Sequence, residues 1–311
     1  MQFSEQVVLI TGASRGLGLA FARCIAQAGA TVVLNSRGND KAGQSAAAQI
    51  VEQGGKAIHI SGPAQAAADL VESAVNQCGR LDAIVHNAGF VQDKTLRKMT
   101  NAQWDAVLTV HLKAAFELSQ AAWPHFEDQG GGRLVFISSA SGLYGNFGQA
   151  NYAAAKAGLH GLSQSIAIEG EAANIKCNCV APFGATQMNS QNFPQALKMA
   201  IKADYIAPLV AATHLHDAVL VFVEPPEVER LKQHVAELGE RDAVLALEAT
   251  LDRIFGHHLV DRHVFANVAQ EVDHTNGTGP VVVVHHLGGV GRAAIKIEET
   301  AQNGGDALDI V

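Results

Sequence analysis

Short runs of apolar and β-branched residues recur along the first two thirds of the chain, separated by longer alanine-rich stretches with helical periodicity. Runs that are apolar throughout are typical of strands in a parallel sheet that helices cover on both faces. Because βαβ crossovers are right-handed, the pattern predicts an α/β fold built on a doubly wound parallel sheet. The predicted strands are Val7–Ile10, Thr31–Leu34, Lys56–Ile60, Ala83–Val85, Leu134–Ile137 and Ile175–Val180, with helices such as Gly18–Ala28 and Ala64–Cys78 between them.

This alternation is regular to about Val210 and then changes, so we predict three parts. Residues 1–213 form the α/β domain, residues 214–275 form a helical insertion, and residues 276–311 carry the last strand and a C-terminal tail. The segment Glu224-Pro225-Pro226-Glu227 is a helix-start signal, because proline suits the first helical turn and acids suit the helix dipole. Helices are expected at Glu227–Leu238 and Arg241–Phe255, and one more buried strand at Val281–Val284.

Composition restricts the class of protein. Hydrophobic residues make up 48% of the 311 residues and charged residues 17%, which is typical of a folded chain with a sizeable core. The net charge of −8 argues against a nucleic-acid partner. No apolar run approaches the ~18 residues of a membrane span, and no basic targeting segment precedes Val7, so we expect no membrane association and a cytoplasmic location.

Neither the cysteines nor the histidines suggest a metal site. The four cysteines are scattered without a CxxC pair, so we expect no disulfide framework and no zinc site. Nine of the 14 histidines lie beyond residue 213, including His257, His258 and His263 near Asp261, but without a recognised ligand spacing. Surface histidines are therefore the preferred interpretation, and no metal is predicted.

A glycine-rich turn, Thr11-Gly12-Ala13-Ser14-Arg15-Gly16-Leu17-Gly18, follows the first predicted strand. Glycine lets the backbone turn tightly and approach a phosphate, and the following helix directs N–H groups and its positive dipole end at the anion. An ordinary glycine-rich turn is the alternative, but the position between the first strand and first helix is the one that phosphate binding requires. The pyrophosphate of a dinucleotide is therefore predicted to bind Gly12, Ser14, Arg15, Gly16, Leu17 and Gly18.

Candidate catalytic residues follow the fifth strand. Tyr152 and Lys156 are four residues apart in a helical stretch, which places them on one helix face, and Ser139 lies at the end of the strand. An ammonium group ~4 Å from a phenol at an effective dielectric of ~20 is worth about 4 kcal/mol, or ~3 pK units toward the phenolate. Lys156 is thus expected to bring the pKa of Tyr152 near 7, where a general acid/base works best. The alternative is a packed tyrosine beside a solvated lysine.

These motifs resemble the short-chain dehydrogenase/reductase family from Met1 to Val210, about two thirds of the chain. The resemblance identifies residues 1–213 as a Rossmann-type catalytic domain that binds a nicotinamide dinucleotide. It makes Ser139, Tyr152 and Lys156 the catalytic triad, with Lys156 and Tyr152 also reaching the cofactor. By position it adds Asn87, Ala88 and Gly89 after the fourth strand, and Pro182 and Thr186 in the loop that holds the nicotinamide amide.

Three departures from the family pattern accompany the resemblance. The fourth catalytic position, an asparagine in most members, is His111 here, and we include His111 among the catalytic candidates. The aspartate that usually contacts adenine after the third strand is missing from Ser61-Gly62-Pro63. The last strand is displaced by an insertion of some fifty residues.

The stretch Ser138–Pro182 is closer to two subgroups, the (3R)-hydroxyacyl-CoA dehydrogenases of multifunctional enzymes type 2 and the 3-oxoacyl-ACP reductases. The resemblance therefore implies hydride transfer between a nicotinamide cofactor and a 3-oxoacyl/3-hydroxyacyl thioester of CoA or ACP. The alternatives are a ketoreductase of another small carbonyl or a sterol, and a catalytically idle dinucleotide-binding protein. Lys94, Arg97 and Lys98 form a basic patch that is either a solvated helix end or a contact for CoA phosphates or a carrier protein.

The end of the second strand bears on the choice of cofactor. An NAD site carries an acid there that bonds the adenosine 2′-hydroxyl, whereas this chain has Ser36 followed by Arg37. Arg15 lies in the glycine turn on the same side of the adenosine, and two guanidinium groups suit a phosphate dianion. We therefore predict NADP(H), with NAD(H) as the alternative.

Assembly is expected from the resemblance alone. Family members pair through the helices that correspond here to Asn101–Gln129 and Asn151–Gly170, so a homodimer or homotetramer is implied. The second of these stretches is rich in small residues, which permit close helix approach. Because the insertion is expected to block further assembly through the last strand, a dimer is the preferred prediction.

Overall fold

The fold is described from a computed structural model of the chain. The structure describes residues 3–38, 41–182, 203, 206–207 and 210–211, and the backbone of three further strands, Leu220–Val223, Val281–His285 and Ala294–Glu298. Thr186 and the predicted helices Glu227–Leu238 and Arg241–Phe255 lie outside the described residues.

The strands are arranged in one sheet with the order β3-β2-β1-β4-β5-β6-β7-β8-β9. Pairing is parallel from β3 across to β7, and antiparallel between β7 and β8 and between β8 and β9. Their bounds are β1 Val7–Thr11, β2 Thr31–Ser36, β3 Lys56–Ser61, β4 Ala83–His86, β5 Gly132–Ile137, β6 Ile175–Pro182, β7 Leu220–Val223, β8 Val281–His285 and β9 Ala294–Glu298.

Helices follow the first five strands in turn. Their bounds are α1 Gly16–Gln27, α2 Lys41–Glu52, α3 Ala67–Cys78, α4 Asn101–Leu108, α5 Ala114–Asp128, α6 Ala140–Tyr144 and α7 Ala150–Glu169, with 3₁₀ turns η1 Leu96–Lys98 and η3 Glu171–Ala173 and a π-helical turn η2 Thr109–Lys113. The predicted α/β fold with a doubly wound parallel sheet is confirmed, and each of the six early strands lies within two residues of its predicted range.

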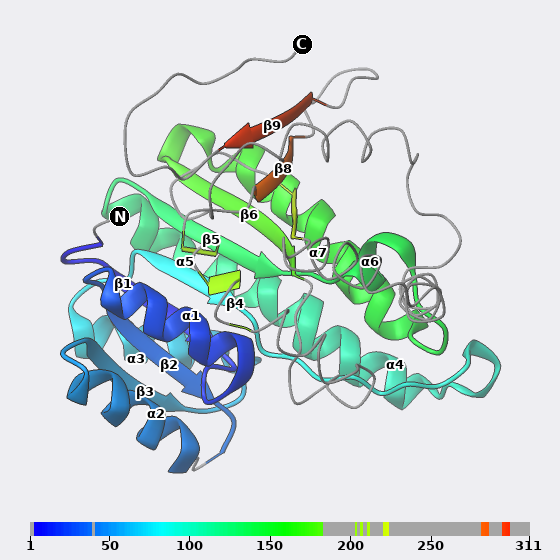
Figure 1. Cartoon of the computed structure of the whole chain (residues 1–311), viewed down its shortest axis with the longest axis horizontal. Helices are drawn as coiled ribbons and strands as arrows, with labels where there is room; N and C mark the ends of the chain where they lie inside the picture. The colour runs from blue at the N-terminus through cyan, green and yellow to red at the C-terminus, as the bar shows by residue number, and fades with distance from the viewer. Residues whose placement is uncertain are drawn as a thin grey trace, which may run out of the picture.

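The two faces of the sheet are buried by different helices (Figure 1). Along β1, Val8 and Ile10 pack toward α1 and α2, whereas Val7 and Leu9 pack toward α3, α5 and α7. All five residues of β1 are buried, which is why its first four, Val7 to Ile10, are all apolar and do not alternate with polar residues.

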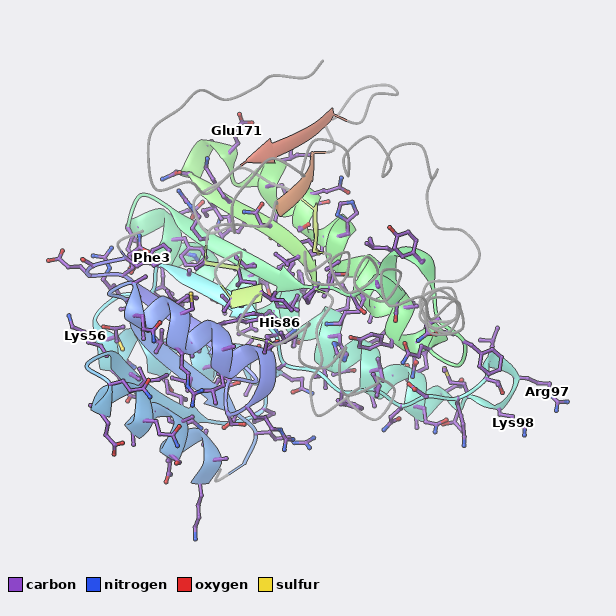
Figure 2. All side chains as sticks on the ribbon, in the orientation of Figure 1. Phe3, Lys56, His86, Arg97, Lys98 and Glu171 are labelled. Atoms are coloured by element: carbon purple, nitrogen blue, oxygen red, sulfur yellow. The ribbon has the colours of Figure 1, made fainter. Side chains whose placement is uncertain are left out.

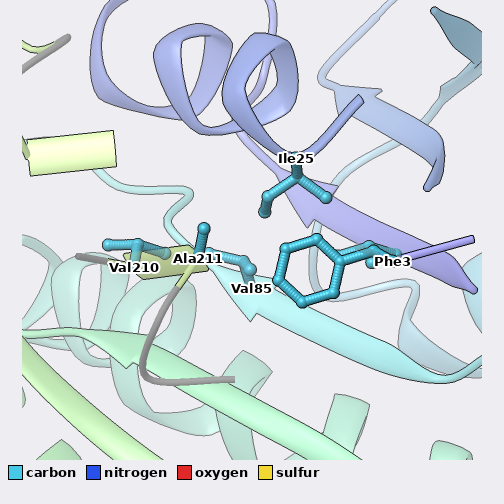
Figure 3. Close-up of a pocket in the computed structure, with 6 residues that line it drawn as sticks. Phe3, Ile25, Val85, Val210 and Ala211 are labelled. Carbon is cyan, nitrogen blue, oxygen red and sulfur yellow. The ribbon is translucent and has the colours of Figure 1, made fainter. Parts of the chain in front are cut away.

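The described residues near 210 pack on the face of the sheet that α1 and α2 cover. Val210 and Ala211 pack beside Phe3, Ile25 and Val85, and every side chain that lines this contact is apolar (Figure 3). Among the described residues, this contact therefore extends the core and presents only apolar side chains.

The region after residue 211 differs in part from the prediction. β7 is a strand within residues 214–275, where we expected helices, and it pairs parallel with β6. The predicted strand at Val281–Val284 is present as β8, but it runs antiparallel to β7 and is followed by β9. The three-part division of the chain stays a prediction.

Strand order places the polar sequence motifs at one edge. β2 and β3 lie on one side of β1, whereas β4, β5 and β6 lie on the other, so the connection reverses direction between β1 and β4. Ligands of such sheets bind beyond the carboxyl ends of the strands at this reversal. The motifs after β1, β4, β5 and β6 therefore belong to one site.

Candidate active site

The glycine turn packs tightly on the neighbouring strand connection. Gly12 has φ +66°, and a Cβ added there would lie 2.8 Å from Cα of Ala88. A Cβ on Gly18 would lie 2.4 Å from the carbonyl oxygen of Gly12, which leaves no room for a side chain. These two glycines are required by close backbone packing between the turn, α1 and the residues after β4.

Asn87 and Thr11 hold the two connections together. The Asn87 side-chain amide donates to the carbonyl oxygens of Thr11 and Gly12, each at 3.2 Å. The Thr11 hydroxyl accepts the backbone N–H groups of Asn87 at 3.1 Å and Ala88 at 3.0 Å. These bonds fix the glycine turn relative to β4.

The N-terminus of α1 is suited to an anion. Arg15 is the N-cap residue, and neither a side-chain capping bond nor an acid in the first turn satisfies the N–H groups of this described helix. Uncapped N–H groups and the positive end of the dipole are the features that bind a pyrophosphate. The turn from Gly12 to Gly18, with half-buried Ser14 and Leu17, therefore fits a dinucleotide.

At the end of β2, Ser36 is buried and its hydroxyl hydrogen-bonds Nε2 of His59 at 2.7 Å. Gly43 permits this pair, since a Cβ there would lie 2.3 Å from Nε2 of His59. Arg37 and Arg15 are exposed, and their side chains form no hydrogen bond or ion pair with described residues. Sequence reasoning missed His59, because nothing in its β3 sequence marks it as a neighbour of Ser36.

Ser139, Tyr152 and Lys156 converge at the end of β5. Ser139 caps α6 by accepting the N–H of Ser141 at 3.2 Å, and a hydrogen bond joins its hydroxyl to Tyr152. Nζ of Lys156 lies 5.5 Å from the centre of the Tyr152 ring and donates to the carbonyl oxygen of Ile137 at 2.5 Å.

The electrostatics differ from the expectation for the tyrosine. Burial raises the pKa of Tyr152 above its usual 10, although the hydrogen bond from Ser139 acts in the opposite direction. The predicted depression toward 7 is thus wrong for this arrangement, in which burial is the largest influence on the pKa of Tyr152. Burial lowers the pKa of Lys156 to about 8.

His111 packs between the residues that follow β4 and Tyr152. Its ring meets that of Tyr152 edge to face at 5.1 Å, and its Nε2 lies 2.8 Å from the carbonyl oxygen and 3.1 Å from the N–H of Phe90. A Cβ on Gly89 would lie 2.0 Å from Cε1 of the ring, so Gly89 makes room for it. Burial holds the pKa of His111 well below its usual value, and the ring stays neutral.

The π-helical turn η2 contains His111 and exposes its carbonyl group to another histidine. Nε2 of buried His86 lies 3.0 Å from that carbonyl oxygen, and its Nδ1 lies 3.1 Å from the hydroxyl of Thr11. Because the Thr11 oxygen already accepts two N–H groups, its proton goes to Nδ1, and Nε2–H of His86 donates to His111. Burial lowers the pKa of His86 to about 4, first by desolvation and then by the charge of Lys156.

His86 was not among the predicted site residues, since β4 is otherwise apolar and a lone histidine carries no motif. Its signal was a polar residue inside a buried strand directly before Asn87. Pro182 ends β6 at the same edge of the sheet, as predicted, whereas Thr186 lies outside the described residues. The catalytic and cofactor-binding roles of the predicted residues stay predictions.

A doubly wound parallel sheet with a glycine turn and with Ser139, Tyr152 and Lys156 at the carboxyl ends of its strands is typical of one class of dinucleotide-dependent oxidoreductases. The chain belongs to the short-chain dehydrogenase family, whose model, described as short chain dehydrogenase, matches residues 6–196. Members of the family use nicotinamide dinucleotides, and the chain is an enzyme of that family. The resemblance found in the sequence is thereby confirmed.

Comparison with individual proteins gives a more specific result than the family model. The chain is 43% identical over 218 residues to peroxisomal multifunctional enzyme type 2 of Mus musculus, covering 68% of this chain and 30% of that protein. It is 40% identical over 218 residues to peroxisomal multifunctional enzyme A of Dictyostelium discoideum, covering 68% of this chain and 49% of the relative. The chain therefore spans less than half of the length of these relatives.

Comparison with solved structures supports the same family assignment. The full-length peroxisomal multifunctional enzyme type 2 of Drosophila melanogaster superposes with a TM-score of 0.61 at 33% identity, covering 72% of this chain and 38% of that one. A short chain dehydrogenase from Mycobacterium avium gives a TM-score of 0.66 at 32% identity, covering 72% of this chain and 84% of that one.

No helix among the described residues is long and apolar enough to span a bilayer. Those residues also contain no cluster of three or more histidine, cysteine or acidic side chains suited to a metal.

Proposed function

We propose that the chain transfers hydride between NADP(H) and a 3-oxoacyl/3-hydroxyacyl thioester, with Tyr152 as general acid/base. The observation that supports it is the convergence of Ser139, Tyr152 and Lys156 at the carboxyl end of β5, beside a turn that fits a dinucleotide. The similarity to peroxisomal multifunctional enzymes favours an acyl thioester substrate.

Each side chain has a separate task in the reductive direction. The bound nicotinamide supplies the hydride. The raised pKa of Tyr152 keeps its phenol protonated, so its O–H is available to the carbonyl oxygen of the substrate. The Ser139 hydroxyl donates to the same oxygen as negative charge grows there. The Lys156 ammonium, 5.5 Å from the ring centre, stabilises the phenolate that remains.

The choice of NADP(H) rests on the end of β2. The Ser36 hydroxyl is bonded to His59, and no acid is present at this position to repel a 2′-phosphate. The exposed guanidinium groups of Arg37 and Arg15 are available for that phosphate. Ser36 then acts by holding His59, and Arg37 provides the charge.

The test is cofactor oxidation with acetoacetyl-CoA, comparing kcat/KM for NADPH and NADH. We expect a preference for NADPH that Arg37→Ala reduces by about tenfold, the loss of one charge-assisted contact. Lys41→Ala, an exposed cation on α2, is the matched control and leaves the preference unchanged. A wild-type preference for NADH would refute the cofactor assignment. Turnover of other carbonyls but not of acetoacetyl-CoA would favour a different ketoreductase, and no turnover at all would favour an idle dinucleotide-binding protein.

Assembly and location complete the proposal. A groove of about 610 Å³ runs over α4, η2, α5 and α7, and half-exposed Phe116 lines it. An open apolar face of this kind supports pairing of two copies through these helices. The cytoplasmic location predicted from the sequence stays a prediction, since the relatives above are named as peroxisomal proteins.

A further inference from the structure

Two exposed segments meet close to Tyr152. One follows β4 and comprises residues 93–98, and the other, residues 144–149, leads into α7. The N–H of Lys94 donates to the carbonyl oxygen of Gly148 at 2.7 Å, and Lys94 and Gln149 form an isolated parallel bridge. The side-chain amide of Gln149 also donates to the Asp93 carboxylate at 3.2 and 3.3 Å. The two segments therefore form one surface, and α7 carries Tyr152 in its first turn.

This surface is positive in a chain whose net charge is −8. Lys94, Arg97 and Lys98 are exposed, and their side chains form no hydrogen bond or ion pair with described residues. The carboxylate of Asp93 is turned to Gln149. Arg97 and Lys98 project from the edge of the molecule that lies opposite Lys56 (Figure 2). Three cations against one acid indicate an anionic partner.

Large side chains on the same two segments are also exposed. Leu96 is 74% exposed, Phe147 is 88% exposed and Tyr144 is 41% exposed. Exposed aromatic rings stack on nucleobases, and lysine and arginine bind phosphates. Together they supply the two kinds of contact that a phosphorylated purine nucleotide requires, stacking for the base and positive charge for the phosphates.

We propose that this basic–aromatic surface, formed by Lys94, Leu96, Arg97, Lys98, Tyr144 and Phe147, binds the phosphorylated adenosine end of a coenzyme A thioester. The acyl end of the same molecule then reaches Tyr152. This rests on the proposed function and names the carrier on which the acyl group arrives. A stable interface with a carrier protein typically buries about 800 Å² on each partner, whereas a nucleotide needs only a few cations and an aromatic ring, so the nucleotide is the better match to these six residues.

Binding of free coenzyme A tests the proposal without turnover. Calorimetry is carried out with saturating nicotinamide cofactor, so that coenzyme A does not occupy the dinucleotide site. We expect Arg97→Glu/Lys98→Glu to weaken binding about tenfold, Phe147→Ala to weaken it several-fold, and 3′-dephospho-coenzyme A to bind more weakly than coenzyme A. The matched control is Lys56→Glu, an exposed cation on the opposite edge, which leaves the affinity unchanged.

Kinetics separates this proposal from the proposed function. With acetoacetyl-CoA, the double variant is expected to raise KM about tenfold at constant kcat. With the N-acetylcysteamine thioester of acetoacetate, which lacks the nucleotide, kcat/KM stays at the wild-type value. Wild-type protein that does not bind coenzyme A, or a double variant that binds it as wild type does, would overturn the proposal. So would a defect confined to acyl-carrier-protein thioesters. Binding as expected without turnover of either thioester would refute the proposed function alone.

Discussion

At the residue scale, the protonation states of Tyr152 and Lys156 decide the direction in which the site works best. Burial raises the pKa of the phenol and lowers that of the ammonium group, because both charged forms lose solvation. The phenol is therefore a proton donor at neutral pH. Lys156 keeps its charge up to a pH of about 8.

A pH profile tests this arrangement. We expect kcat/KM for carbonyl reduction to be level below a pH of about 8 and to fall above it, as Lys156 loses its proton. Lys156→Arg should move the falling limb to higher pH, since arginine stays charged. A reductive rate that rises through pH 8 would contradict the assignment.

The hydroxyl of Tyr152 is tested separately by Tyr152→Phe. This change removes the proton donor and keeps the ring that packs against His111. Turnover should fall by at least about 100-fold, the range of general acid catalysis. The cofactor dissociation constant, measured by fluorescence titration, should stay within a factor of about two. More than a tenth of the wild-type rate would rule out the proposed role.

Gly89 shows how a small residue admits a catalytic candidate. Gly89→Ala would place a Cβ 2.0 Å from the His111 ring, so we expect a loss of about 1–3 kcal/mol in the free energy of unfolding. Gly161→Ala is the matched control, because it lies within α7 with nothing within 4 Å of the added Cβ. It should stabilise the protein by roughly 0.5–1 kcal/mol through helix propensity. Urea unfolding of both variants provides the comparison. A Gly89→Ala variant as stable as the wild type would show that the His111 ring moves aside.

At the element scale, the π-helical turn η2 links β1, β4 and the helices that follow. The turn presents the His111 carbonyl to His86, and His86 in turn holds the Thr11 hydroxyl that anchors Asn87. π-helical turns are frequent at functional sites because they redirect backbone groups in this way. A single histidine thus connects the glycine turn to the catalytic side chains.

Acid unfolding reports on this link. His86 has a pKa of about 4 in the fold against about 6.5 when unfolded, so the unfolded chain binds the proton first as pH falls. Its stabilising contribution is present above pH 6.5 and is lost between about 6.5 and 4, on the order of 3 kcal/mol. His111, whose pKa is also lowered, acts in the same direction.

The variant His86→Gln isolates this contribution. Removing the titrating ring should reduce the slope of unfolding free energy against pH in that interval, while His111 maintains the remainder. Urea unfolding at half-unit pH steps measures both slopes. Identical slopes would mean that His86 is not the titrating group.

At the scale of the whole molecule, the open groove on α4, η2, α5 and α7 predicts a homodimer. Phe116 is 48% exposed in this groove, and Gly158 lets Leu112 approach α7, where an added Cβ would lie 2.7 Å from the leucine. Phe116→Asp should convert a dimer into a monomer in light scattering at micromolar concentration, since it buries a charge in the contact. The matched control Leu96→Asp, on a different exposed surface, should leave the dimer intact. A wild-type monomer would remove the claim.

Much of the architecture was already predictable from the sequence. Buried strands such as β1 are apolar over most of their length, from Val7 to Ile10 in this case, and that pattern has few alternatives to a covered parallel sheet. The glycine turn was equally predictable. Gly12 has a positive φ and Gly18 has no space for a Cβ, so both positions require glycine and the requirement is visible in the sequence. The antiparallel direction of β8 was not, since a valine run carries no information about its partner's direction.

What the sequence by itself determined was therefore local: helix and strand periodicity, the glycines of the turn, and the spacing of Tyr152 and Lys156 on one helix face. What only the tertiary structure decided was the surroundings of those groups. The pairs Ser36–His59 and His86–Thr11 join residues 23 and 75 positions apart, and no local pattern encodes such contacts. The raised pKa of Tyr152 arises from burial among distant segments, a desolvation that depends on packing and that residue spacing alone does not reveal.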